Sequence, residues 1–150
     1  MANKKTRAVD KEEFEKIIST IRTGFTLPNG DRVRPNERVA TALTLQANLG
    51  LRIGDIVHLR LADIILEGGR YHLDIVEQKT GKARNFTVPT EVYIYLQNYT
   101  IQQGLRPTQK LFPLTVRAVQ LHLQKVCRYL GITGVSTHSF RKFFAVSIYI

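Results

Sequence analysis

The chain has 150 residues, of which 43% are hydrophobic, and its 22 Lys and Arg against 12 Asp and Glu give a formal net charge of +10. This length is enough for one domain with a hydrophobic core and argues against two. No apolar run approaches the roughly 18 residues of a membrane span, and the N-terminal residues lack the apolar segment of a secretory signal, which together favour a cytoplasmic protein without a membrane partner.

The positive charge favours a polyanionic partner, and nucleic acid is the commonest one for a basic domain. Lys and Arg are spread along the chain rather than gathered in one tail, which is typical of a folded surface. Charge alone also fits ribosome-associated proteins and membrane-surface binders. The single cysteine, Cys127, cannot form an internal disulfide, and its helical spacing with apolar neighbours predicts a buried position in a reducing compartment.

The first part of the chain predicts a helix followed by a loop. Residues 10–22 have apolar side chains at helical spacing, with Asp10 as N-cap and Glu13 completing a capping box. Residues 24–34, which contain Pro-Asn-Gly, predict a loop or a short hairpin.

A second helix is predicted from Pro35 to about Asn48, where Gly50 can end it. Its inward side chains are expected to be Val39, Ala42, Leu43 and Ala47. A short helical turn is expected from Asp55 to Leu59.

The periodicity then changes from helical to alternating. Strands are predicted at residues 64–67, 71–78 and 83–88, joined by a Gly-Gly turn and by a tight turn at residues 80–82. Two adjacent hairpins of this kind make a small three-stranded antiparallel sheet.

Three further helices follow, at residues 90–103, at 115–130 and from 138 onward, with Thr90, Thr115 and Thr137 as expected N-caps. Gly104 and Gly131 are expected to end the first two of them. The expected fold class is therefore α+β, and mainly α, with one small antiparallel sheet.

Four basic residues lie in contexts that suit phosphate binding. Arg52 follows the second helix, and Lys79 lies at the tip of the second hairpin. His138 and Arg141 are three residues apart at the start of the last helix, where free backbone N–H groups and the helix dipole favour anions. Arginine can also donate to two phosphate oxygens at once. Each residue taken alone is as well explained by a solvated surface or, for Arg52, by a pair with Asp55.

In this order, the four residues resemble the signature of the tyrosine site-specific recombinases, the phage integrase family. Residues 48–55, N-L-G-L-R-I-G-D, are similar to the family's T-G-L-R-x-x-E/D segment. Residues 79–82, K-T-G-K, match its hairpin lysine motif, and residues 137–145, T-H-S-F-R-K-F-F-A, match its H-x-x-R helix. The resemblance covers about residues 10 to 150.

The resemblance implies a pocket for phosphodiester transfer on double-stranded DNA. Arg52 and Arg141 would clamp the scissile phosphate, Lys79 would protonate the leaving 5′ oxygen, and His138 would bind the phosphate and assist proton transfer. Asp55 would support the pocket structurally. In other enzymes a metal ion stabilises the charge of the phosphate, whereas here the guanidinium groups would do so. No metal and no cofactor is therefore expected.

The chain also departs from the family pattern, in which a further His or Trp and then the nucleophilic tyrosine follow the H-x-x-R helix. Tyr149 is too close to Arg141 for that role and is expected to be a core residue. We therefore expect residues 10–150 to be a truncated catalytic domain that binds DNA without cleaving it alone. Residues 1–9 are expected to be a linker or a disordered N-terminus, and a full-length protein would join a synaptic tetramer.

Five other basic side chains are candidates for contacts with DNA phosphates, although a solvated surface explains each of them equally well. They are Lys82, Arg84, Arg117, Lys125 and Arg128.

Three alternative functions remain open on the sequence. A type IB topoisomerase uses a similar pocket, although the short hairpin and compact spacing favour an integrase. A non-catalytic DNA-binding or regulatory protein could use the same fold for occupancy. An RNA-binding module is the third, but the sequence shows no RRM or KH signature.

Overall fold

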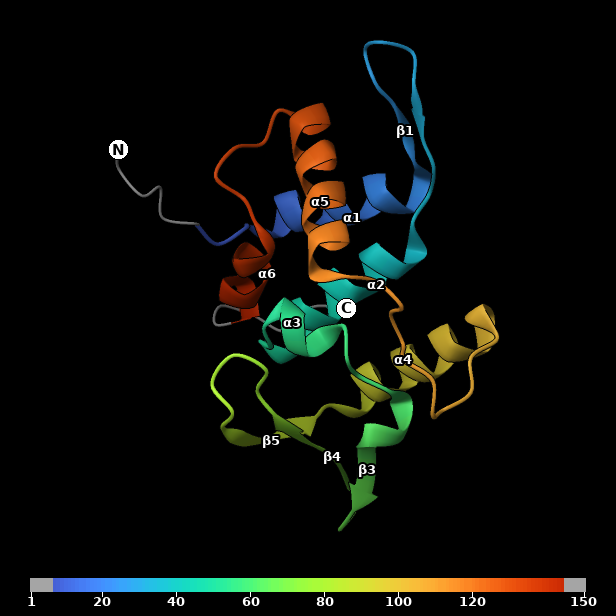
Figure 1. Cartoon of the computed structure of the whole chain (residues 1–150), viewed down its shortest axis with the longest axis vertical. Coiled ribbons are helices and arrows are strands. Elements are labelled where there is room, and N and C mark those ends of the chain that lie inside the picture. The colour runs from blue at the N-terminus through green and yellow to red at the C-terminus, as the bar shows by residue number, and fades with distance from the viewer. Residues whose placement is uncertain (1–6, 145–150) are drawn as a thin grey trace.

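The computed structural model describes residues 7–144, and it confirms a mainly helical α+β fold with a small three-stranded sheet (Figure 1). The helices are α1 (Lys11–Thr23), α2 (Glu37–Leu49), α3 (Ile53–Ile56), the 3-10 turn η1 (Leu61–Asp63), α4 (Thr90–Gln103), α5 (Val116–Leu130) and α6 (Thr137–Phe144). The strands are β1 (Phe25–Thr26), β2 (Arg32–Val33), β3 (Ile64–Glu67), β4 (Arg70–Val76) and β5 (Ala83–Val88).

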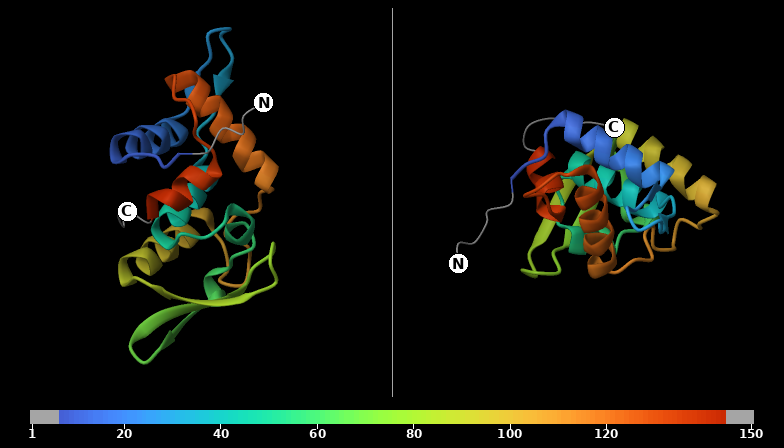
Figure 2. Two further views of the ribbon diagram at one scale, coloured as in Figure 1. Left: turned by 90° about the vertical axis from the view of Figure 1, so that its left-hand side faces the viewer. Right: turned by 90° about the horizontal axis from the view of Figure 1, so that it is seen from above.

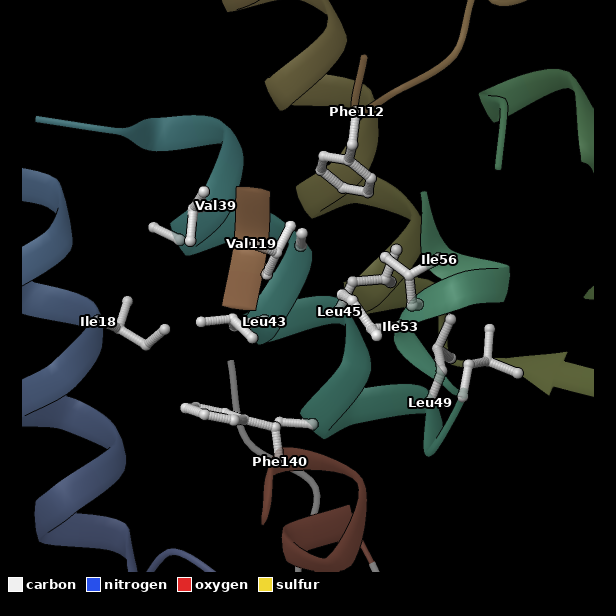
Figure 3. Packing of buried hydrophobic residues seen from close by; sticks show 14 of the residues in the cluster. Ile18, Val39, Leu43, Leu45, Leu49, Ile53, Ile56, Phe112, Val119 and Phe140 are labelled. Carbon is white, nitrogen blue, oxygen red and sulfur yellow. The ribbon is translucent and has the colours of Figure 1, made fainter. Parts of the chain in front are cut away.

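Helix α2 forms the centre of the hydrophobic core. The four expected inward residues are buried, but so is every other residue from Val39 to Leu49. Leu43 lies among Ile18 of α1, Val119 of α5 and Phe140 of α6 (Figure 3). The prediction of one inward face was therefore too narrow, because α1, α3, α4 and α6 all contact α2 and α5 also lies against it.

Two polar side chains of α2 are buried without loss of hydrogen bonding. The Thr44 hydroxyl donates to the Ala40 carbonyl at 2.8 Å, and the Asn48 side-chain amide donates to the Thr44 carbonyl at 2.8 Å. Such bonds to the preceding turn satisfy polar groups inside a helix. They allow these two polar residues to be buried with the apolar ones.

The helix ends largely confirm the predicted capping. Asp10 and Glu13 form the capping box of α1, and the Thr115 hydroxyl accepts from the Ala118 amide. The predicted caps Thr90 and Thr137 are wrong by one position, since each is the first residue of its helix. Pro89 is the N-cap of α4.

Ser136 takes the place of Thr137 at the start of α6. Its hydroxyl accepts from the His138 amide at 3.3 Å, and its own amide donates to the Ser139 hydroxyl at 3.0 Å. This reciprocal pair satisfies amide groups that the helix leaves without partners.

The sheet has the order β3-β4-β5, and both pairs are antiparallel. It lies at one end of the molecule, and the β1–β2 hairpin lies at the other (Figures 1 and 2). Stacked rings of Tyr71 on β4 and Tyr93 on α4, with centroids 4.0 Å apart, hold the sheet against the helical part.

Two predicted boundaries near the sheet are wrong. Strand β4 ends at Val76 rather than Gln78, because the Gln78 amide donates to the Asp55 carboxylate instead of to a strand. The helical turn α3 begins at Ile53 and ends at Ile56, because the Arg52 carbonyl accepts the Asp55 and Ile56 amides.

Individual buried apolar side chains hold α6 against the rest of the fold. Phe140 is 0% exposed, and its ring centroid lies 6.0 Å from that of Phe14. We predict that Phe140→Ala lowers the free energy of unfolding by about 3–5 kcal/mol, because it opens a cavity between α6, α1 and α2. Urea denaturation followed by circular dichroism measures this change.

The matched control is Ile101→Ala, at a position that is 72% exposed, where a change within about 0.5 kcal/mol is expected. Equal effects of the two substitutions would contradict this packing.

Candidate nucleic-acid interface

Segments far apart in the sequence meet at one cavity of about 230 Å³. The N-terminus of α3, the β4–β5 turn, the first turns of α5 and the start of α6 surround it. Three of the four predicted catalytic residues, Arg52, Lys79 and His138, line it together, and so does the predicted supporting residue Asp55. Lys79 and His138 are exposed, whereas Arg52 is half-buried, so the cavity opens to solvent.

Backbone geometry places Arg52 at this cavity. Gly50 ends α2 in the left-handed region, with φ of 69° and ψ of 22°. This conformation, which favours glycine, turns the chain away from the helix axis. Arg52 is then the extended residue that precedes α3.

Arg141 approaches the same place from α6. It is not among the residues that line the cavity, but its Nε donates to the Gly50 carbonyl at 3.0 Å, two residues before Arg52. Burial lowers the pKa of Arg141, the positive charges of Arg52 and Arg84 lower it further, and the carboxylates of Glu77 and Asp55 oppose this. Arg141 therefore lies within electrostatic range of both Arg52 and Arg84.

Asp55 ties α3 to the hairpin that carries Lys79. Its side chain is 6% exposed, and Oδ1 accepts from the Gln78 amide at 2.9 Å. From the sequence, an ion pair with Asp55 is the simplest explanation of Arg52. The structure forms a different ion pair. Arg52 Nη1 instead donates to Glu77 Oε2 at 3.3 Å.

Glu77 is a charged residue beside the site that the sequence analysis missed. Its carboxylate accepts from the Thr80 hydroxyl at 2.7 Å and from Arg84 Nη1 at 3.1 Å, in addition to Arg52. The Thr80 and Arg84 hydrogen bonds and the charge of Arg52 lower the pKa of Glu77. A signal was present, because strand alternation from the buried Leu73 places Glu77 on the inner face of the sheet.

The other predicted DNA contacts are placed differently. Arg84 lies beside the site, and its guanidinium carbon is 4.6 Å from the Phe86 ring centroid. The remaining four, Lys82, Arg117, Lys125 and Arg128, are exposed and do not line the cavity. Instead, Val116 and Gln120 of α5 and Thr137 of α6 complete its wall, and none of these three was predicted.

Among residues 7–144, no group of three or more His, Cys, Asp or Glu side chains is placed to hold a metal ion. No helix in this part of the chain has the length and apolar character needed to cross a membrane.

The fold is similar to those of several solved recombinases. The XerH site-specific recombinase bound to palindromic difH substrate aligns over 97% of this chain and 42% of its own, with a TM-score of 0.67 and 20% identity. A lambda integrase dimer bound to a COC′ core site aligns over 97% of this chain and 53% of its own, with a TM-score of 0.71 and 17% identity.

The Tn1549 transposon integrase in complex with circular intermediate DNA is a third similar structure, with a TM-score of 0.64 and 17% identity. It aligns over 95% of this chain and 52% of its own, so the chain spans about half the length of these proteins.

No curated protein matches the sequence significantly. The model of the phage integrase family matches residues 7–149, which is nearly the whole chain. The chain therefore belongs to the phage integrase family.

Proposed function

We propose that this chain binds double-stranded DNA and supplies the phosphate-binding part of a site-specific recombinase active site. The observation that carries the proposal is the convergence of Arg52, Lys79 and His138 on one cavity, with Arg141 bonded to the backbone beside it. The net charge of +10 and membership of the phage integrase family support it. Its setting is the cytoplasm, where DNA is accessible.

Each of the four residues has a role that suits its position. Arg52 and Arg141 hold the non-bridging oxygens of the scissile phosphate and stabilise the charge that grows in the pentavalent transition state. Lys79, exposed on a turn, protonates the leaving 5′ oxygen as general acid. His138, on the first turn of α6, donates a hydrogen bond to the phosphate and assists proton transfer.

The attacking tyrosine of this reaction comes from elsewhere. None of the tyrosines within residues 7–144 lines the cavity, and Tyr149 lies outside the described residues. We infer that the described part of the chain binds and activates the phosphate, and that it cleaves no strand without a tyrosine from another segment or another subunit. A synaptic tetramer of recombinase subunits would provide such a partner.

Five exposed basic residues extend the proposed DNA surface beyond the cavity. They are Lys82 and Arg84 on the hairpin and Arg117, Lys125 and Arg128 on α5. In this proposal they contact DNA phosphates without reading the base sequence.

Removing either arginine of the clamp should weaken DNA binding. We predict that Arg52→Ala and Arg141→Ala each raise the Kd for a short duplex by about tenfold, because each removes a charge-assisted hydrogen bond. Fluorescence anisotropy over a range of salt concentrations measures this, with circular dichroism to verify folding. For the parent chain, log affinity should fall against log salt by about 0.9 per phosphate contacted.

Arg106→Ala is the matched control, because Arg106 is exposed and does not line the cavity. If all three variants bind as tightly as the parent across the salt range, the proposed clamp is wrong.

Asp55 is proposed to support the site by fixing the hairpin. We predict that Asp55→Ala speeds hydrogen exchange of the Gln78 amide by about tenfold or more, because the acceptor of that amide is lost. Asp55→Asn keeps an acceptor oxygen and should leave the exchange rate close to that of the parent. Exchange measured by NMR that is equally slow in both variants would show that Asp55 does not hold the turn.

A further inference from the structure

The proposed roles leave out Glu77, an acidic side chain at the edge of a site built to bind an anion. A carboxylate near a phosphate would repel it, so its presence requires a physical reason. Glu77 is 6% exposed, and it directly follows the end of β4, two residues before Lys79.

Both oxygens of Glu77 are engaged. Oε1 accepts from the Thr80 hydroxyl at 2.7 Å, while Oε2 accepts from Arg52 Nη1 at 3.3 Å and from Arg84 Nη1 at 3.1 Å. These donors come from the β4–β5 turn, from the N-terminus of α3 and from β5. A carboxylate with donors on both oxygens cannot rotate freely, so it fixes the two arginines relative to the turn.

Charge gives a second reason for an acid at this position. Arg52, Arg84 and Arg141 lie close enough that the first two lower the pKa of the third. Like charges at this spacing repel one another unless an anion lies between them. Glu77 supplies that anion before any phosphate is bound.

The pairing leaves part of Arg52 available for a ligand. Within residues 7–144 its guanidinium donates to no acceptor other than Glu77, and only Nη1 is used. Nε and Nη2 remain as donors, and Arg52 lines the cavity. A guanidinium held through one nitrogen can offer the other two to phosphate oxygens with little loss of side-chain entropy.

We propose that Glu77 is a positioning residue that holds the guanidinium groups of Arg52, which lines the cavity, and of Arg84, which lies beside it, in one orientation ready for a DNA phosphate. This inference rests on the proposed function for its ligand, although the positioning itself exists in the free protein. Glu77 touches no reacting atom and acts through Arg52.

The free protein tests the positioning directly. Nitrogen-15 relaxation of the arginine Nε–Hε groups should show Arg52 and Arg84 more rigid than the exposed Arg106. In Glu77→Gln, which keeps the shape and removes the charge, Arg52 and Arg84 should become as mobile as Arg106, with order parameters below about 0.6.

Glu37→Gln is the matched control, because Glu37 pairs with Arg22 at 3.0 Å, and neither residue lines the cavity. It should leave Arg52 and Arg84 rigid. If these two arginines are as mobile as Arg106 in the parent, the inference is overturned, and this result does not depend on whether Glu77→Gln folds.

Binding to a short duplex then tests the consequence for the ligand. Glu77→Gln should weaken binding of the duplex at least about threefold when Arg52 is present. The corresponding free energy lies within the range of coupling energies between residues in contact. In the Arg52→Ala background the same substitution should cause a clearly smaller loss, because only Arg84 of the two arginines that Glu77 positions is still present. A merely structural role would give equal losses in both backgrounds, and equal losses would overturn the inference.

A parent chain that folds but does not bind the duplex would refute the proposed function and leave the relaxation data to decide on Glu77. Binding by the parent together with unchanged arginine mobility in Glu77→Gln would support the function and refute the positioning. The two claims therefore fail separately.

Discussion

Helix α2 is buried along most of its length, and the other helices pack around it. From Val39 to Leu49 its side chains are buried among α1, α3, α4, α5 and α6. A helix packed on several sides has little freedom to shift or rotate. Its C-terminal end at Gly50 is therefore a fixed point, and the chain leaves it directly into Arg52.

The same fixed point holds the second arginine. The Gly50 carbonyl accepts from Arg141 Nε, so a backbone group at the end of α2 positions a side chain that is 91 residues away in the sequence. Phe140, the neighbour of Arg141, packs against the side of α2. Core packing and site geometry are thus parts of one arrangement, since α6 cannot move on α2 without moving Arg141 relative to Arg52.

The site combines several positive charges with two buried carboxylates that have different tasks. Asp55 accepts a backbone amide and holds the hairpin against α3, whereas Glu77 accepts from side chains and offsets their charge. Both carboxylates are 6% exposed, so they are shielded from solvent while Lys79 and His138 remain open to it. A phosphate would meet exposed donors first and the ordered guanidinium groups behind them.

Local chemistry made much of this structure predictable from the sequence. The capping box of Asp10 and Glu13, the cap at Thr115 and the glycines that end α2, α4 and α5 act within a few residues, so their patterns give the helix ends. The strand β5 and the turn before β4 were also predicted correctly.

The wrong predictions have a common cause: each of these features depends on contacts with segments that are distant in the sequence. Helix α2 is buried on several sides because other helices pack against it. The spacing of apolar residues within α2 gives no information about these neighbours. Strand β4 ends earlier than predicted because the Gln78 amide donates to Asp55, which lies 23 residues before it in the sequence. The sequence motifs predicted four basic positions, three of which line the cavity. Glu77 was not predicted, since its contacts depend on the convergence of Arg52 and Arg84 in space.

The most informative measurement is a titration of the nitrogen-15-labelled chain with a short duplex, in which the arginine side-chain signals are followed by NMR. If a phosphate binds at the cavity, the Nε–Hε signals of Arg52 and Arg141 should shift together at one DNA concentration, while that of Arg106 stays in place. Shifts confined to Arg117 and Arg128 on α5, with Arg52 and Arg141 unchanged, would show that DNA binds elsewhere and that the cavity is not a phosphate site.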